Sequence, residues 1–311
     1  LHMSKPNNEH GMTLYDAARA MGVSFSSEAV PRDKFIQVGT RRFHYLEWGD
    51  PSNPPMLLLH GYAQTCHSWD FVALALCDKF RVLSLDQRGH GDSDWSDSGD
   101  YSPESYWTDL DLIVKTLELS NLVVMGLSMG GRNAISFTAN YPDRVRALVV
   151  VDSAPSMQKT GSERMRKFVQ GEDELDSVDD FVKRVQEYNP SRPADQIKGS
   201  IMHNLKQLPN GKWTWKYDKV LRSPDRKVPG IDYAGLLWNH IEKLDIPTLV
   251  VIGSNSDMVN LETANELHKR IKNSRLATVA DAGHLVMGDN PAGFEKAVRK
   301  FISELNLASR P

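Results

Sequence analysis

The sequence predicts an α/β protein in which a mostly parallel sheet carries helices on both faces. Short apolar runs rich in β-branched residues alternate with amphipathic segments of helical period. This alternation covers residues 56–151 and resumes over 246–305, and it is typical of a doubly wound sheet. No apolar run reaches the roughly 18 residues that a membrane span requires.

The elements follow in order along the chain. Residues 13–21 predict a short amphipathic helix that stops at Gly22, and residues 34–38 and 43–48 predict antiparallel strands around a Gly39-Thr40 turn. Residues 56–59 are the first candidate for a central strand. Further strands are expected at 81–85, 122–125, 145–151, 246–252 and 276–279, and helices at 68–77, 103–119, 129–140, 261–271 and 291–305.

The strand series is interrupted between residues 155 and 244. This stretch is rich in charge and predicts helices, with 213–215 as its one short β-like piece. We therefore expect a tail and short helix at 1–29, a core made of 30–154 and 245–311, and an insertion at 155–244. The insertion is expected to lie over the carboxyl edge of the sheet, where open α/β sheets bind ligands.

Composition narrows the function classes. The chain has 311 residues, 40% of them apolar and 25% charged, and a net charge of −3. Without a basic run it gives no sign of nucleic-acid binding or of stable membrane association. Cys66 and Cys77 are too few for a disulfide framework, and the amino-terminal residues lack an apolar signal core, so we expect a cytoplasmic protein. Small-molecule substrates and a monomer or homodimer fit this composition.

Residues 126–130 match the pattern G-x-S-x-G. They join the apolar run 122–125 to the helix expected at 129–140, so Ser128 is predicted at the apex of a sharp strand-to-helix turn. Gly126 and Gly130 lack side chains that such a turn would crowd. A serine at a helix N-terminus, with its hydroxyl exposed, is typical of an activated nucleophile.

A base and an acid are expected to accompany this serine. Among the ten histidines, His284 follows the last core strand and lies downstream of Ser128, which suits a general base. Asp257 follows the strand expected at 246–252 and is favoured as the acid. Asp152 follows the strand at 145–151 and is the competing acid. Activity should fall on the acid side as His284 becomes protonated.

Two backbone amides are expected to bind an oxyanion. Met129 follows the nucleophile, and Tyr62 lies in the loop after the first central strand, so their N–H groups are the candidates. Residues 86–93 form a glycine-rich loop without the lysine of a P-loop. We interpret it as a structural loop in which Arg88 pairs with acids, and His90 is a weaker candidate base.

These motifs together resemble the α/β-hydrolase superfamily, specifically its lid-bearing serine esterase and lipase-like branch. The resemblance rests on His60-Gly61, residues 86–93, residues 126–131, and Gly283-His284 ahead of 289–291. It implies a mostly parallel eight-stranded sheet, a largely helical cap, no cofactor or metal, and Ser128, Asp257 and His284 as a triad. One departure is that Ser256 occupies the position where the acid usually stands.

The function that follows is hydrolysis of carboxylic esters through an acyl-enzyme. Lactonase, perhydrolase and carbon–carbon bond hydrolase activities remain alternatives on the same scaffold, and a non-catalytic binding protein is a further one. A nucleophilic serine argues against dehalogenases and epoxide hydrolases, which use aspartate. Trp213, Trp215 and Trp238 either line a substrate pocket or form the core of the insertion.

Overall fold

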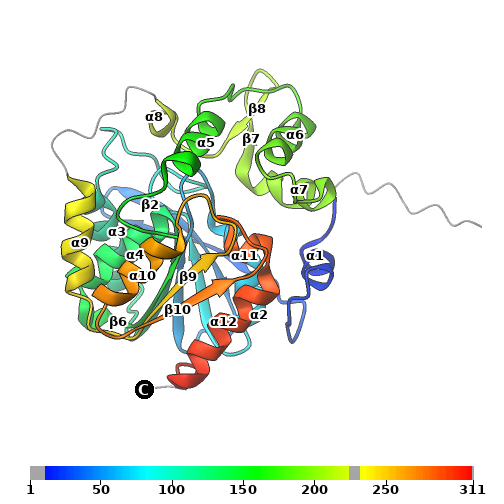
Figure 1. Cartoon of the computed structure of the whole chain (residues 1–311). Helices are drawn as coiled ribbons and strands as arrows, with labels where there is room; N and C mark the ends of the chain where they lie inside the picture. The colour runs from blue at the N-terminus through cyan, green and yellow to red at the C-terminus, as the bar shows by residue number, and fades with distance from the viewer. Residues whose placement is uncertain (1–10, 224–231, 310–311) are drawn as a thin grey trace, which may run out of the picture.

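An eight-stranded sheet forms the centre of the computed structural model, which describes residues 11–223 and 232–309 (Figure 1). Its strand order is β1-β2-β4-β3-β5-β6-β9-β10. The strands are β1 (Arg32–Val38), β2 (Arg41–Trp48), β3 (Pro55–Leu59), β4 (Arg81–Leu85), β5 (Leu122–Leu127), β6 (Val145–Val151), β9 (Thr248–Gly253) and β10 (Ser274–Val279).

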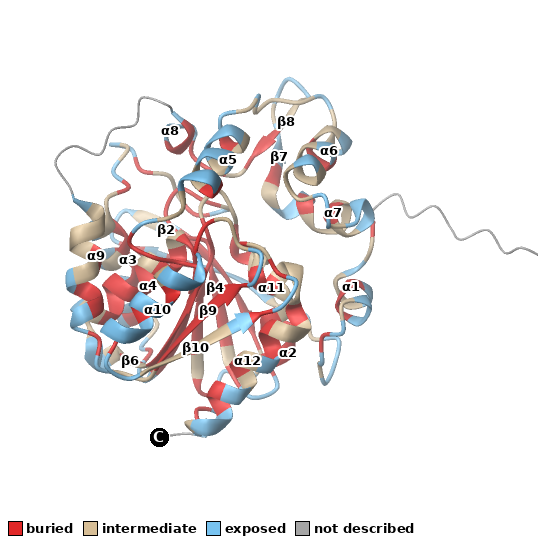
Figure 2. Ribbon diagram, viewed as in Figure 1, coloured by how far each residue is buried: buried red, intermediate tan, exposed pale blue. Residues whose placement is uncertain are grey.

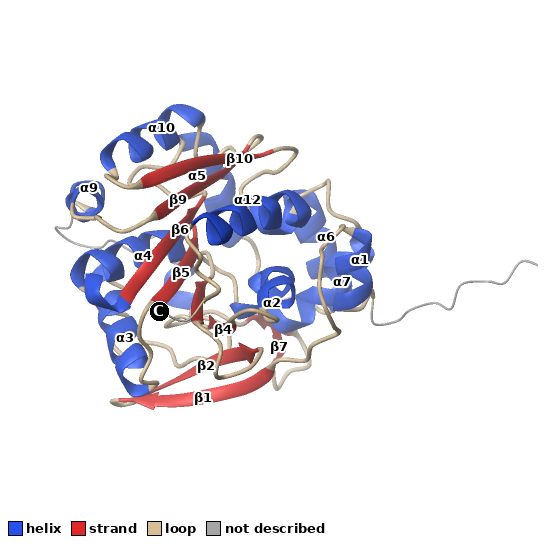
Figure 3. Ribbon diagram, turned by 90° about the horizontal axis from the view of Figure 1, so that it is seen from below, coloured by secondary structure: helices blue, strands red, loops and turns tan. Residues whose placement is uncertain are grey.

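The sheet is mostly parallel, as predicted. Strand β2 pairs antiparallel with both β1 and β4, and every other pairing in the sheet is parallel. Seen from below, the strands rotate progressively from β1 to β10, which is the usual twist of such sheets (Figure 3). Strands β5 and β9 are buried at every position, as expected for strands covered on both faces. The predicted fold class is confirmed.

Helices cover both faces of the sheet, and the sheet separates two apolar cores. One face carries α3 (Pro103–Thr116), α4 (Met129–Asn140), α9 (Tyr233–Glu242) and α10 (Leu261–Arg270). The other carries α1 (Leu14–Ala20), η1 (Cys66–Trp69), α2 (Asp70–Leu76), α11 (Val286–Asp289) and α12 (Pro291–Glu304). A short turn of helix, η2 (Pro142–Arg144), precedes β6. Burial is concentrated on the sheet and on the helix sides that face it (Figure 2).

Residues 155–223, called here the insert, lie over the carboxyl ends of the strands (Figure 1). Its elements are α5 (Lys159–Val169), α6 (Val178–Tyr188), α7 (Ala194–Ile201), η3 (Met202–Asn204), β7 (Leu205–Gln207), β8 (Trp213–Trp215) and α8 (Lys219–Arg222). The insert has its own apolar cluster, in which the rings of Phe181 and Trp215 meet edge to face.

Helix α9 falls within the predicted insertion but packs elsewhere. Its buried residues Leu237 and Ile241 join the apolar cluster of α3, α4 and α10 rather than that of the insert. The part of the predicted insertion formed by α9 therefore packs with the core, because α4 covers the apolar stripe of α9.

The amino-terminal helix α1 contacts both parts of the molecule. It packs against α2 of the core and α7 of the insert. The amide of Met12 donates to the carbonyl of Asp195, and Gly199 lies so close that a Cβ there would meet the Met12 carbonyl oxygen at 2.2 Å. None of the described helices combines the length and apolar character needed to cross a membrane.

Candidate active site

Ser128 stands between β5 and α4 in a strained conformation. Its backbone angles are φ 54° and ψ −115°, a left-handed region that few non-glycine residues adopt. Its amide donates to Val151 O at 3.0 Å, and Ser153 Oγ donates to Ser128 O at 2.7 Å. These contacts to the end of β6 hold the turn, and the serine lines a cavity beneath the insert.

Two glycines make this turn possible. A Cβ on Gly126 would lie 2.2 Å from the carbonyl oxygen of Gly130. A Cβ on Gly130 would lie 2.2 Å from Leu59 O and 2.5 Å from His60 O. All three contacts are with backbone atoms, which cannot move aside like a flexible side chain. Larger residues would therefore separate α4 from the end of β3.

His284 lies on the loop between β10 and α11 and is buried. Its Nδ1 is 2.6 Å from Oδ2 of Asp152, a fully buried carboxylate at the end of β6. An ionised carboxylate can only accept hydrogen bonds, so Nδ1 carries the proton and Nε2 is the unprotonated nitrogen. This is the tautomer that a general base requires.

Asp152 is held by further donors. Ser256 Oγ donates to Asp152 Oδ2 at 2.6 Å, and the amide of Gly253 approaches Oδ1 at 3.4 Å. Asp152 itself has φ 44°, which turns the chain sharply at the strand end. Its side chain consequently projects toward β9 and His284. Ser256 stands where the family usually has its acid. Here its hydroxyl donates a hydrogen bond to Asp152, which comes from the end of the neighbouring strand β6.

Asp257 does not contact His284, and the expectation that it orients this imidazole is wrong in this structure. Its carboxylate binds Arg164 of α5, with Oδ2 2.7 Å from Nε and Oδ1 3.1 Å from Nη2. The physical reason is the guanidinium, which draws the carboxylate toward the insert. Sequence placement favoured Asp257, while the geometry selects the competing residue, Asp152.

The loop after β3 carries the predicted amide donor Tyr62, which lines the same cavity as Ser128 and Met129. Buried His60 fixes the start of this loop: its Nδ1 donates to Gly61 O at 2.7 Å, and its Nε2 accepts from the Gln87 amide at 3.0 Å. Burial lowers the pKa of His60, so the ring stays neutral and can both donate and accept. The Tyr62 hydroxyl donates to the carbonyl of Leu221 in the insert.

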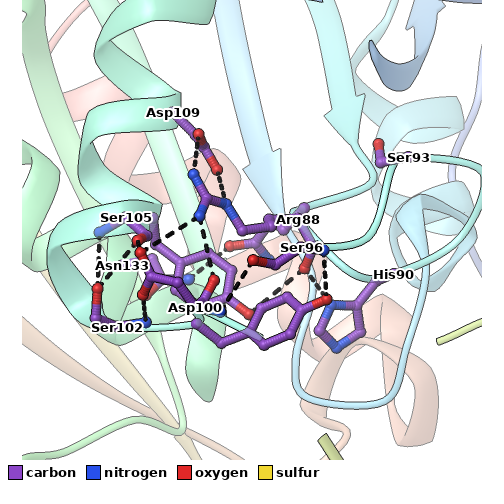
Figure 4. A network of polar contacts seen from close by, with 12 residues as sticks. Arg88, His90, Ser93, Ser96, Asp100, Ser102, Ser105, Asp109 and Asn133 are labelled. Atoms are coloured by element: carbon purple, nitrogen blue, oxygen red, sulfur yellow. Dashed lines mark hydrogen bonds and ion pairs between the residues drawn. The ribbon is translucent and has the colours of Figure 1, made fainter. Parts of the chain in front are cut away.

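The glycine-rich loop from residue 86 onward is a structural support (Figure 4). Arg88 forms a two-pronged pair with Asp109 of α3, with both N–O distances 2.7 Å. Arg88 Nη1 also donates to the carbonyl oxygen of Asp100 at 3.1 Å. The pairing of Arg88 with acids is thus confirmed. His90 Nε2 accepts from the amide of Ala63 at 3.2 Å, so this histidine supports the Tyr62 loop.

A cavity of about 700 Å³ lies between the core and the insert, with Ser128 in its wall. Its aromatic lining consists of tyrosines rather than tryptophans. The lining residues are Tyr62, Tyr101, Pro103, Tyr106, Ser128, Met129, Arg132, Asn133, Ser136, Pro155, Met157, Ser162, Met165, Arg166, Val169, Gln170, Leu221, Arg222, Ser223, Tyr233, Leu236, Leu237 and Met258.

The three tryptophans considered for the pocket lie outside this lining. Trp215 is buried in the core of the insert, and Trp213 pairs with Leu175 through backbone hydrogen bonds beside it. Trp238 packs on the outer core, with the guanidinium of Arg270 4.4 Å from its ring centroid. The pocket interpretation is therefore wrong for all three in this structure, because none of them lines the cavity.

Two clusters in the described ranges carry side chains of the kind that bind metals: His44, Cys66 and Asp86, and His67, Asp70 and His203. In the first, His44 Nδ1 is 2.7 Å from Asp86 and its Nε2 is 2.9 Å from Asp33, so both ring nitrogens are already hydrogen-bonded. In the second, the rings of His67 and His203 stack 3.5 Å apart. Neither cluster includes a residue that lines the cavity.

A strained serine turn, a buried carboxylate–histidine pair and a cavity lined by that serine are the features expected of an α/β hydrolase. A family profile described as the alpha/beta hydrolase fold matches residues 54–291, so the chain belongs to this family. The family resemblance seen in the motifs is confirmed.

Individual relatives are esterases and other hydrolases. The chain is 32% identical over 277 residues to Esterase Rv0045c of Mycobacterium tuberculosis, covering 87% of this chain and 89% of that protein. It is 30% identical to the 3-hydroxybutyrate-oligomer hydrolase of Cupriavidus necator, covering 85% of this chain and 95% of that protein. The crystal structure of the M. tuberculosis esterase superposes with a TM-score of 0.75, covering 96% of this chain and 100% of that one. These relatives support hydrolase activity on small molecules.

Proposed function

We propose that the protein is a serine esterase that cleaves carboxylic esters of small molecules through a triad of Ser128, His284 and Asp152. The observation that carries the proposal is the 2.6 Å contact between His284 Nδ1 and Asp152, because it leaves Nε2 as the basic nitrogen. The strained turn that presents Ser128 to the cavity supplies the nucleophile. The esterase relative supports the same chemistry.

The reaction would proceed in two steps. His284 Nε2 takes the proton of Ser128 Oγ as this oxygen attacks the ester carbonyl, and Asp152 stabilises the resulting imidazolium. The amides of Met129 and Tyr62 bind the oxyanion, and the alcohol leaves with the proton from His284. Water, activated by the same imidazole, then releases the acid and restores Ser128.

The insert would act as a lid over this site. Met165 and Val169 of α5 and Leu221 of α8 close one side of the cavity, while Ser128 and Met129 form part of the other side. A covered site excludes bulk water, which strengthens the interactions that stabilise developing charge. The tyrosines Tyr62, Tyr101 and Tyr106 line the space that the acyl or alcohol group would occupy.

The test is turnover and covalent labelling. Wild-type protein should hydrolyse 4-nitrophenyl esters of short acids, and Ser128→Ala should lower kcat by at least about 10⁴-fold because no nucleophile remains. A fluorophosphonate probe should label Ser128, as located by peptide mass spectrometry. Ser26→Ala, which alters an exposed serine, is the matched control and should keep both properties. Labelling of a different residue, or full activity of Ser128→Ala, would overturn the proposal.

A further inference from the structure

Three arginines line the cavity, Arg132, Arg166 and Arg222, and no aspartate or glutamate of the described ranges lines it. Guanidinium groups remain protonated in proteins, so the cavity has a positive wall. A purely apolar ester gives no reason for such a wall, because a partly buried cation without a counter-charge is destabilising.

The three arginines differ in how their charge is balanced. Arg222 is paired with Asp173 and lies 4.6 Å from the centroid of the Tyr217 ring. Arg166 is exposed on α5, where water can solvate it. Arg132 is half-buried and has no carboxylate partner among the described residues. Its Nε donates to Ala154 O at 2.9 Å, and its Nη2 approaches Pro155 O at 3.4 Å.

These two carbonyl contacts orient the guanidinium but do not neutralise it. Within residues 11–223 and 232–309, Arg132 Nη1 makes no hydrogen bond, and the residue lines the cavity. Burial lowers the pKa of Arg132, which is the direction expected for a desolvated cation that lacks a compensating anion. Among the described residues, no carboxylate balances the charge of this guanidinium.

The position of Arg132 relative to Ser128 determines where an anionic group bound by Arg132 would lie in the substrate. The Arg132 amide donates to Ser128 O at 3.0 Å, so the two residues are one helical turn apart at the start of α4. The contacts to Ala154 O and Pro155 O hold the guanidinium just beyond Asp152, and Arg132 and Ser128 line the same cavity. An anion held by Arg132 would therefore lie in the same cavity as the carbonyl that Ser128 attacks.

We propose that Arg132 binds a carboxylate group of the substrate, so that the preferred substrates are esters that carry a free carboxylate near the scissile bond. The planar guanidinium matches a planar carboxylate through paired N–H···O bonds. This inference rests on the proposed esterase function and names the substrate class of the same site. It assigns to Arg132 a role in binding and specificity and none in the proton transfers.

The experiment compares kcat/KM within two pairs of esters, in each of which one member carries a free carboxylate and the other does not. Mono-4-nitrophenyl glutarate against 4-nitrophenyl pentanoate places the carboxylate on the acyl side, and 4-(butanoyloxy)benzoate against phenyl butanoate places it on the alcohol side. Wild-type protein should prefer the charged member of at least one pair by on the order of 10- to 100-fold, the effect of a hydrogen-bonded ion pair. Arg132→Gln should bring that ratio close to one, and Arg132→Lys should keep part of it.

Lys167→Gln is the charge-matched control, because it removes one positive charge from an exposed position of α5 that does not line the cavity. It should keep the wild-type ratio. Equal rates within both pairs in wild-type protein, or an unchanged ratio in Arg132→Gln, would overturn the inference while the esterase function stands.

Direct binding separates the inference from the esterase function. Glutarate should raise the melting temperature of wild-type protein and of Ser128→Ala, but not that of Arg132→Gln, whose fold is checked by circular dichroism. If none of the four esters is cleaved, the esterase function fails, and the glutarate shift still decides the role of Arg132. The absence of a shift in wild-type protein would contradict carboxylate binding.

Discussion

Asp257 and Arg164 form a two-pronged ion pair that joins the loop after β9 to helix α5, with N–O distances of 2.7 and 3.1 Å. Arg164 also donates to Tyr188 O at 2.8 Å, and its guanidinium lies 4.4 Å from the Tyr188 ring centroid. The carboxylate that sequence position favoured as the triad acid therefore connects the core to the insert. Asp152 takes its place beside His284.

Replacing each aspartate by asparagine should separate the two roles. Asp152→Asn should lower kcat by roughly 10³–10⁴-fold, because an amide neither stabilises the imidazolium nor enforces the proton on Nδ1. Asp257→Asn should change kcat/KM by less than about tenfold, because a partly exposed ion pair contributes about 1 kcal/mol or less. Steady-state kinetics on one ester measure both. A loss in Asp257→Asn as large as that in Asp152→Asn would contradict the assignment.

The buried pair of His44 and Asp86 should make stability depend on pH. Burial raises the pKa of Asp86, but the hydrogen bond from His44 and the nearby donors outweigh it and bring the value to about 2. Burial lowers the pKa of His44, but the hydrogen bonds to Asp86 and Asp33 and the negative charges of Asp86 and Asp92 outweigh it and raise the pKa above the ordinary 6.5.

The two pKa shifts stabilise the fold over different pH ranges. The lowered pKa of Asp86 gives stability that is present above its unfolded value of about 3.9 and is lost as the pH falls toward 2. The raised pKa of His44 gives stability that is complete below about 6.5 and is lost as the pH rises through its folded value. His44→Gln should therefore reduce the free energy of unfolding more at pH 5.5 than at pH 9.

Urea denaturation at both pH values measures this difference. His268→Gln, which changes an exposed imidazole on α10 that bonds to Ser274, is the control and should show a much smaller difference between the two pH values. An equal destabilisation by His44→Gln at pH 5.5 and pH 9 would show that the charged pair has no such role.

Gly130 should not tolerate a side chain. An alanine Cβ would lie 2.2 Å from the Leu59 carbonyl oxygen, and relieving that contact would displace the loop that carries Tyr62. Gly130→Ala should destabilise the fold by about 3 kcal/mol or more and lower esterase activity. Gly288→Ala, where the nearest atom is Leu285 Cβ at 3.9 Å, should change stability by less than about 1 kcal/mol. Thermal denaturation compares the two, and a wild-type melting temperature for Gly130→Ala would contradict the close packing of the turn.

Much of the fold could be predicted because its signals are local. Apolar runs and helix signals placed the strands and helices of the main sheet within a few residues of their observed bounds. The short strand β7 was not predicted, because its sequence Leu205–Gln207 carries one apolar residue and forms a strand by pairing with β8. Helix α9 was assigned to the insertion because its packing partner α4 is remote in sequence.

The sequence located the strained turn at Ser128 but selected neither the carboxylate that contacts His284 nor the aromatic residues that line the cavity. Ser128 and its glycines form a contiguous motif, whereas Asp152 and Asp257 follow β6 and β9, two strands that are neighbours in the sheet. Strand position alone cannot separate them. The choice depends on the sharp backbone turn at Asp152 and on Arg164, which comes from 93 residues away. Ser256 was the sequence signal that favoured Asp152, because a hydroxyl at the usual position of the acid can donate a hydrogen bond to a carboxylate from another strand.

Helix α1 has a practical consequence for handling the protein. Its neighbour Met12 packs backbone to backbone against α7, so a fusion partner or surface linkage placed just before residue 11 would lie beside the insert. The other end of the described chain lies on the opposite side of the molecule, where Arg146 binds the carbonyl oxygens of Asn306, Leu307 and Ser309 (Figure 1). Attachment through the carboxyl terminus therefore places a sensor chip or resin on the side of the molecule away from the insert.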